Sequence, residues 1–156
     1  MRVQKSNILL GIWATGLLIL TAACGKDKFT TRPQLKFVKA SSYDVPRGGI
    51  MQFTLEFTDA EGDLTDSLYI ERVVPQCNAS TNRNLRYAIP AFPATKDAKG
   101  EIEVAFANGV FVPGYVALSS PACGRPDTTT FRFYIKDKEK NVSDTVEVDR
   151  PIIIRN

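Results

Sequence analysis

Acidic side chains gather in two short segments of this chain, and their types and spacing favour the binding of a hard cation. The residues concerned are Asp59, Glu61, Asp63 and Asp66 in the first segment, and Asp137, Glu139, Asn141 and Asp144 in the second. Calcium takes about six to eight oxygen ligands from carboxylates, amides and backbone carbonyls, and two facing loops can supply them. Gly62 permits the sharp turn that wrapping an ion requires. The sequence thus predicts a candidate calcium site formed by Asp59, Glu61, Asp63, Asp66, Asp137 and Asn141.

The same acidic residues also have a simpler interpretation. Aspartate and glycine are frequent in turns, because the aspartate side chain hydrogen-bonds to nearby backbone and glycine adopts positive φ. The spacing is not that of an EF-hand loop, and Lys136, Lys138 and Lys140 could neutralise the acids without an ion. A calcium site and a plain turn therefore both remain open from the sequence.

The sequence lacks the residues that most catalytic, zinc-binding and phosphate-binding sites use. The chain contains no histidine, so it lacks the usual base of a nucleophilic triad and the usual ligand of a zinc site. It has neither a glycine-rich phosphate loop nor a serine in a nucleophile-like Gly-x-Ser-x-Gly setting. We expect a protein that is not an enzyme. No basic stripe is present, so nucleic acid is not an expected partner.

The elements that must position the acidic segments are strands. Residues 51–58 alternate apolar Met51, Phe53, Leu55 and Phe57 with polar side chains, which is the pattern of a strand with one buried face. Further strands are expected at residues 35–39, 66–74, 85–89, 101–106, 131–136 and 146–154, with a turn at 96–100. Short strands separated by turn signals predict an all-β, immunoglobulin-like antiparallel sandwich.

This topology divides the domain into two poles. The strands that begin near Asp66 and Thr129 become antiparallel neighbours, so Cys77 and Cys123 come to one pole and the two acidic segments to the other. Of the three cysteines, Cys24 is assigned below to a lipid anchor, which leaves two in an exported domain. This even number predicts a disulfide between Cys77 and Cys123, against the alternative of two free buried thiols. Closing this loop should stabilise the domain by about 4 kcal/mol.

The N-terminal residues have the layout of a secretory signal peptide. Arg2 and Lys5 precede an uncharged apolar run over residues 8–20, and Ala22 and Ala23 follow it. The run is shorter than the roughly 20 residues that span a bilayer. Cys24 comes directly afterwards, which resembles the signal of bacterial lipoproteins, although Thr21 stands where that family prefers a leucine-like residue. The alternative is an uncleaved membrane anchor.

The lipoprotein resemblance implies that Cys24 is acylated with diacylglycerol and palmitate-type chains and becomes the mature N-terminus. We expect a signal peptide at 1–23, a lipidated cysteine and polar tether at 24–33, and one domain at 34–156. Removing Arg2 and Lys5 lowers the number of basic residues from 20 to 18 against 17 acids, so the mature chain is nearly neutral.

Two further motifs carry a family resemblance. Residues 57–64, Phe-Thr-Asp-Ala-Glu-Gly-Asp-Leu, and residues 134–145, which contain Asp-Lys-Glu-Lys-Asn-Val-Ser-Asp, resemble small Bacteroidota-type surface lipoproteins with immunoglobulin- or cadherin-like domains. The resemblance implies anchoring in the cell envelope, at the outer membrane, with the surface and periplasmic faces both open. In cadherin-like relatives such acids bind calcium between tandem domains, whereas this chain has one domain.

Aromatic residues provide the evidence for a rival ligand. Phe92, Phe111 and Tyr115 lie in irregular segments and could contact a glycan, or they could instead close the ends of the core. Trp13 lies in the signal, so the mature domain has no tryptophan for a sugar platform. We therefore expect a lipid-anchored, non-enzymatic envelope module with a structural or protein-interaction role. The alternative is a ligand-binding accessory lipoprotein for glycan binding or calcium-dependent adhesion.

Overall fold

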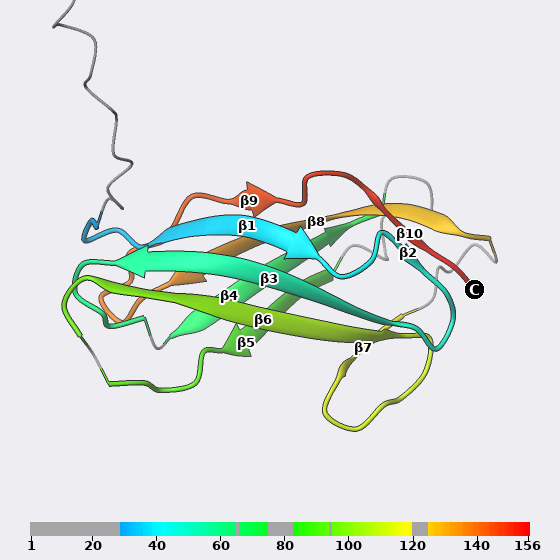
Figure 1. Ribbon diagram of the computed structural model, residues 1–156, viewed down its shortest axis with the longest axis horizontal. Coiled ribbons are helices and arrows are strands. Elements are labelled where there is room, and N and C mark those ends of the chain that lie inside the picture. Colours follow the sequence, from blue (N-terminus) through cyan, green and yellow to red (C-terminus); the bar gives the residue numbers. More distant parts are fainter. Residues whose placement is uncertain (1–28, 65, 75–82, 94, 120–124) are drawn as a thin grey trace, which may run out of the picture.

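Figure 1 shows the computed structural model, which describes residues 29–64, 66–74, 83–93, 95–119 and 125–156. Within these ranges the chain forms strands, turns and loops, and no residue is helical. The described part of the chain accordingly contains no helix that is long and apolar enough to cross a membrane.

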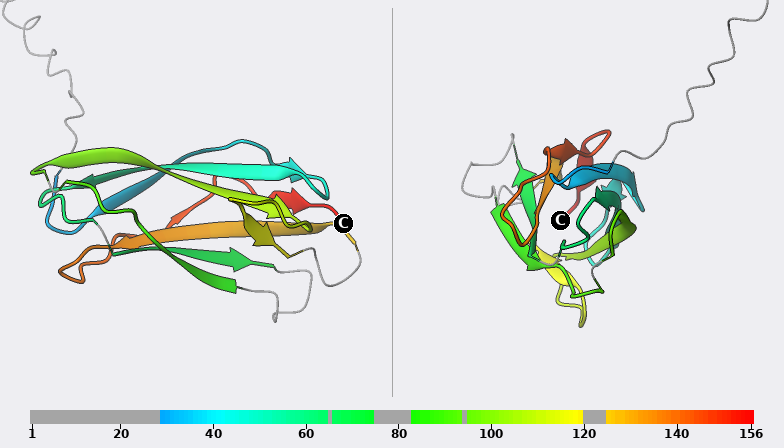
Figure 2. Two further views of the ribbon diagram at one scale, coloured as in Figure 1. Left: turned by 90° about the horizontal axis from the view of Figure 1, so that it is seen from below. Right: turned by 90° about the vertical axis from the view of Figure 1, so that its left-hand side faces the viewer.

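The strands form two packed sheets, which appear as two layers in Figure 2. The first sheet has the order β1 (Gln34–Ala40), β3 (Ile50–Asp59), β6 (Ala98–Asn108) and β7 (Val116–Leu118). The second has the order β2 (Asp44–Val45), β10 (Ile152–Ile154), β8 (Asp127–Lys136), β4 (Ser67–Val73) and β5 (Arg83–Ala88), and β9 (Val146–Glu147) also pairs with β8. The predicted all-β sandwich is confirmed, while the finer immunoglobulin-like assignment stays a prediction.

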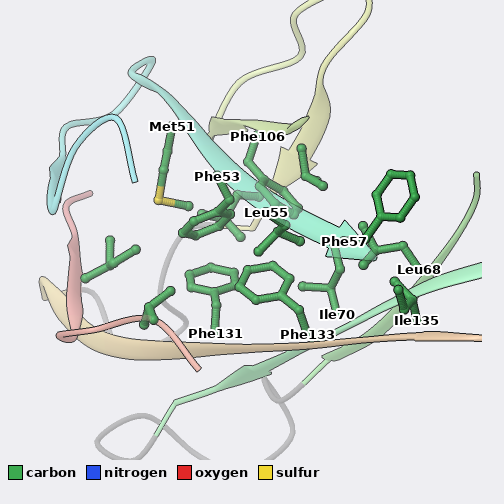
Figure 3. Close-up of a cluster of buried hydrophobic side chains, with 14 of the residues drawn as sticks. Met51, Phe53, Leu55, Phe57, Leu68, Ile70, Phe106, Phe131, Phe133 and Ile135 are labelled. Atoms are coloured by element: carbon green, nitrogen blue, oxygen red, sulfur yellow. The ribbon is translucent and has the colours of Figure 1, made fainter. Parts of the chain in front are cut away.

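The core follows from the alternation of apolar residues. Phe53 of β3 is fully buried, and its ring centroid lies 4.9 Å from that of Phe131 and 5.0 Å from that of Phe133, both on β8. The ring centroid of Phe106, on β6, lies 6.0 Å from that of Phe53. Figure 3 shows these rings meeting between the two sheets. Because successive strand residues point to opposite faces, every second residue of β3 and β8 enters this core.

The predicted pairing of the strands that begin near Asp66 and Thr129 is confirmed. β4 and β8 run antiparallel in one sheet, with Tyr69 opposite Tyr134 and Ser67 opposite Lys136. β10 comes last along the chain but lies inside its sheet, antiparallel to β8 and parallel to β2. Ile152 and Ile154 of β10 are both fully buried.

Two expectations about the strands were wrong in detail. The turn expected at 96–100 is shorter, because residues 98–100 belong to β6 and pair with β3, where the Phe57 ring packs beside Gly100. The last strand divides into β9 and β10. Between them the Tyr43 hydroxyl donates to Asp149 at 2.6 Å, and Arg150 lies over the Tyr43 ring at 3.7 Å. These contacts draw the intervening segment away from a continuous strand.

Candidate metal centre

Two buried strands deliver aspartates to the same pole of the sandwich. Asp59 is the last residue of β3, and Asp137 directly follows β8. Both are almost completely buried, with 0% and 1% of their surface exposed. Together with the partly buried Asp63 they place one carboxylate oxygen each within 4.8 Å of one another. The predicted meeting of the two acidic segments is therefore confirmed for these three residues, which we call the acidic pole.

The loop after β3 is shaped by backbone contacts. The Asp63 amide donates to Oδ2 of Asp59 at 3.0 Å, which closes a tight turn. Gly62 inside this turn has φ of 68°, and a Cβ on it would lie 2.1 Å from the Thr95 carbonyl oxygen. Only glycine fits such a position without strain. The geometry holds Asp63 beside Asp59 rather than in solvent.

The loop after β8 repeats this arrangement. The Asn141 amide donates to Oδ1 of Asp137 at 2.7 Å, and the Asn141 side-chain amide donates to Oδ2 at 2.8 Å. Lys140 takes a positive φ of 74°, and its amide donates to the Asp137 carbonyl at 3.3 Å. Asn141 therefore orients the Asp137 carboxylate through its nitrogen atoms instead of adding an oxygen ligand.

The electrostatics of the acidic pole are unbalanced. Oδ1 of Asp59 is buried and has no hydrogen-bond partner in the described structure. Burial raises the pKa of Asp59, and the nearby Asp63 and Glu61 carboxylates raise it further, while the amides of Asp63 and Gly62 act in the opposite direction. No lysine or arginine of the described ranges forms an ion pair with the three carboxylates.

Three predicted ligands have other positions, which corrects the expected site. Asp66 pairs with Arg86 at 2.9 Å and with Lys140 at 3.2 Å, so its charge is already compensated. The Ser67 hydroxyl, then Lys140 and Arg86, lower the pKa of Asp66 to about 2. Glu61 is exposed and stays outside the group of three, and Asn141 acts on Asp137 as described. Of the three lysines that could have neutralised the pole, Lys140 is directed to Asp66 instead.

The start of the described chain also reaches the acidic pole, a contact that the sequence does not predict. The Ala60 amide donates to the Thr30 carbonyl at 3.2 Å. Arg32 pairs with Asp144 at 2.8 Å in the segment that follows β8. No pattern in residues 29–32 predicts these contacts, because they depend on two loops that only the fold brings together.

The aromatic candidates do not form one platform. Phe92 is partly buried, and its ring lies 5.9 Å from that of Phe57, close to the acidic pole. Phe111 and Tyr115 belong to the loop between β6 and β7, which leaves the opposite end of β6. Phe111 is 82% exposed and Tyr115 is 39% exposed. Only these two can act together at the surface.

The cysteine predictions lie outside the described residues, since Cys24, Cys77 and Cys123 all fall in the omitted segments. The described ends of the flanking segments do meet, at the pole opposite Asp59. Thr129 donates from its hydroxyl to the Val73 carbonyl at 2.8 Å, and Arg72 donates to the Ser119 carbonyl at 2.9 Å. The disulfide and the lipidation stay predictions.

Comparisons with known proteins give little further information. No protein-family model and no curated protein sequence matches the chain. Among solved structures, the chain is similar to the sporulation control protein Spo0M from Bacillus subtilis, with 8% sequence identity and a TM-score of 0.41. The match covers 76% of this chain and 49% of Spo0M, so the chain spans about half the length of that protein. A similarity at this level carries no argument about function.

Proposed function

We propose that the chain is a non-enzymatic interaction module of the cell envelope, anchored by lipid on Cys24, with a calcium ion at the acidic pole. The observation that carries the metal part is the Asp59 carboxylate. It is completely buried beside two other carboxylates, and its Oδ1 has no partner in the described structure. A buried carboxylate is costly unless it is paired or coordinates a metal.

Calcium fits this donor set better than other cations do. The pole offers carboxylate oxygens and no nitrogen or sulfur donor from the described residues, and calcium is a hard cation that prefers oxygen. Asp59, Asp63 and Asp137 would hold the ion, and water or backbone carbonyls would complete its ligands. Magnesium is a poorer fit, because it demands a near-ideal octahedron and gives up its water reluctantly.

The tether contacts relate the metal to the anchor. Cys24 precedes Phe29 by five residues (24 to 29), a segment that can span at most about 18 Å. Thr30 is bonded to the loop that holds Asp63. A lipid on Cys24 would thus keep the acidic pole close to the membrane, while the Phe111 loop would point away from it. Calcium would fasten the two loops at the membrane-proximal end.

Calorimetric titration of the purified chain with calcium tests the metal part. We expect one site per chain, lost in Asp137→Asn and kept in Glu61→Gln, because Glu61 is an acid of the same region that lies outside the pole. Magnesium should give a weaker signal. The absence of heat and of any melting shift at millimolar calcium would remove the metal from the proposal.

Fractionation of cells tests the anchor separately. The wild-type chain should partition with membranes and detergent, and Cys24→Ala should release it, because the acyl chains are lost. A variant that stays in the membrane fraction would instead support an uncleaved hydrophobic anchor over residues 8–20.

The exposure of Phe111 favours a second function, contact with glycans through the β6–β7 loop. Aromatic rings at a surface can stack on the apolar face of a sugar. A glycan array with the wild-type chain should give signals that Phe111→Ala and Tyr115→Ala abolish, whereas Phe92→Ala should leave them unchanged because Phe92 packs on Phe57. An empty array, or signals that survive both changes, would exclude this function.

A further inference from the structure

One edge of β6 has most of its length without a partner strand. β3 pairs with β6 on one side over the whole register from Ile50 opposite Ala107 to Asp59 opposite Ala98. On the other side β7 pairs only with Phe106, Ala107 and Asn108, at one end of β6 (Figure 1). Among the described strands, none pairs with residues 100–105 on this side. With respect to the described residues, the backbone amides and carbonyls that face this side are available to another chain.

An apolar groove of about 780 Å³ runs beside this free edge. The inward-facing side chains of Ile102 and Val104 line it from β6. Leu68 and Tyr87 line it from the second sheet, and Ile89 lines it from the segment that follows β5. It lies where β5 and β6, the outer strands on this side, do not pair with each other. A strand that entered here would extend the backbone ladder of β6 and place alternate side chains in the groove.

A free edge beside an apolar groove is the arrangement used for β-strand addition. The main chain of the incoming peptide supplies the hydrogen bonds, and pockets for alternate side chains supply the selectivity. A small apolar ligand would fill the groove but leave the amides and carbonyls of β6 unused. The two features together therefore favour an extended peptide over a small molecule.

The charges along β6 specify the peptide further. Glu101 and Glu103 point outward, are exposed, and form no ion pair with a described residue, whereas the neighbouring Lys99 pairs with Glu56 at 3.4 Å. Opposite charges directly across two strands are favourable and like charges are not. Pairing of β6 with β6 of a second copy, antiparallel about Ile102, would oppose Glu101 to Glu103. The edge thus disfavours self-association and favours a basic strand.

We propose that the free edge of β6 binds an extended segment of another protein, in which apolar residues enter the groove and alternate with lysine or arginine facing Glu101 and Glu103. This inference names a partner for the interaction module proposed above and rests on that role. It depends neither on calcium nor on lipid.

Two synthetic peptides test the proposal with the purified chain in EGTA. One alternates lysine with valine, and the other alternates glutamate with valine. The lysine peptide should bind the wild-type chain, measured by fluorescence anisotropy. The double variant Glu101→Lys/Glu103→Lys should bind the lysine peptide about tenfold or more weakly than the wild type does, and it should bind the glutamate peptide, because two cross-strand charge pairs reverse sign. Glu139→Lys, an exposed acid on the loop after β8, is the matched control and should bind as the wild type does.

Backbone pairing needs its own readout, because charge alone could attract a basic peptide. Hydrogen exchange should slow at those amides of residues 100–105 that face away from β3. A lysine peptide with N-methyl groups on its hydrogen-bonding edge should not bind. Any of three results would overturn the proposal: unchanged affinity in the charge-reversed variant, binding of the N-methylated peptide, or slower hydrogen exchange in strands other than β6. Because EGTA is present throughout, failure here leaves the calcium site intact, and failure of the calcium titration leaves this edge intact.

Discussion

Replacing Asp59 by asparagine should make the calcium-free domain more stable and at the same time abolish its response to calcium. The change keeps the size of the side chain and keeps an oxygen that can accept from the Asp63 amide. It removes one negative charge from three carboxylates whose oxygens lie within 4.8 Å of one another. A residue that served only the turn would give the opposite result, because its charged form strengthens the hydrogen bond.

The size of the effect can be bounded. Two unit charges at this separation repel by about 3 to 4 kcal/mol at the effective dielectric typical of proteins. The carboxyl can avoid this cost by keeping its proton. Holding the proton at pH 7, against an ordinary pKa of 3.8, costs about 4 kcal/mol, which is therefore the upper limit. Part of the gain is lost with the charge-assisted bond to Asp63. We expect Asp59→Asn to raise the free energy of unfolding by about 1 to 3 kcal/mol, or Tm by roughly 4 to 12 °C.

Thermal unfolding of three chains, each in EGTA and in calcium, provides the assay. At a calcium concentration of 100 times Kd the wild-type chain should gain about 2.7 kcal/mol, and Asp59→Asn should gain nothing. Glu61→Gln, in the same loop but outside the acidic pole, should keep the calcium shift and should gain less stability in EGTA than Asp59→Asn does, because its exposed carboxylate is the last of the groups that raise the pKa of Asp59. A lower Tm of Asp59→Asn in EGTA, or a calcium shift that persists in it, would refute the electrostatic account of the pole.

The remaining predictions concern pH, the turn and the core. In EGTA, the free energy of unfolding of Asp59→Asn should exceed that of the wild type by an amount that grows as pH rises above 3.8 and levels off above the raised pKa of Asp59. The reason is that the unfolded wild-type chain loses this proton at a lower pH than the folded chain does, so the wild type loses stability over this range. Urea unfolding at a series of pH values measures the difference. Gly62→Ala should destabilise by about 2 kcal/mol or more, since a positive φ combines with a collision at Thr95, whereas Gly114→Ala, with positive φ but open space around it, should cost only about 1 kcal/mol. Phe53→Ala should cost about 3 to 5 kcal/mol in the same urea assay, because its ring contacts the core from both sheets, and a smaller loss would mean that the core collapses around the gap.

Much of the fold was predictable because burial imposes a period of two on the strands. The alternation over residues 51–58 predicts β3, and the same pattern at 131–136 predicts most of β8. Once these two strands are placed in opposite sheets, their ends bring Asp59 and Asp137 to one pole. The location of the acidic pole was therefore predictable without any knowledge of side-chain contacts.

The composition of the pole was not predictable, because it depends on which acids find a positive partner. Asp66 and Asp63 look equivalent in the sequence, yet Asp66 meets Arg86 from β5 and Lys140 from another loop. Such pairings are set by the register of strands far apart in the chain. The free edge of β6 was missed for a related reason, since alternation along a strand reveals its faces but not how many neighbours it has.

The position of β10 has a consequence for how the protein is made. Its three residues follow every other described strand along the chain, yet they lie between β2 and β8 within the sheet and contribute Ile152 and Ile154 to the core. Until they are made, β2 and residues 127–129 of β8 have no partner among the described strands. The second sheet can therefore be completed only after residues 152–154 have been made, which places the closure of the core late in the folding of this domain.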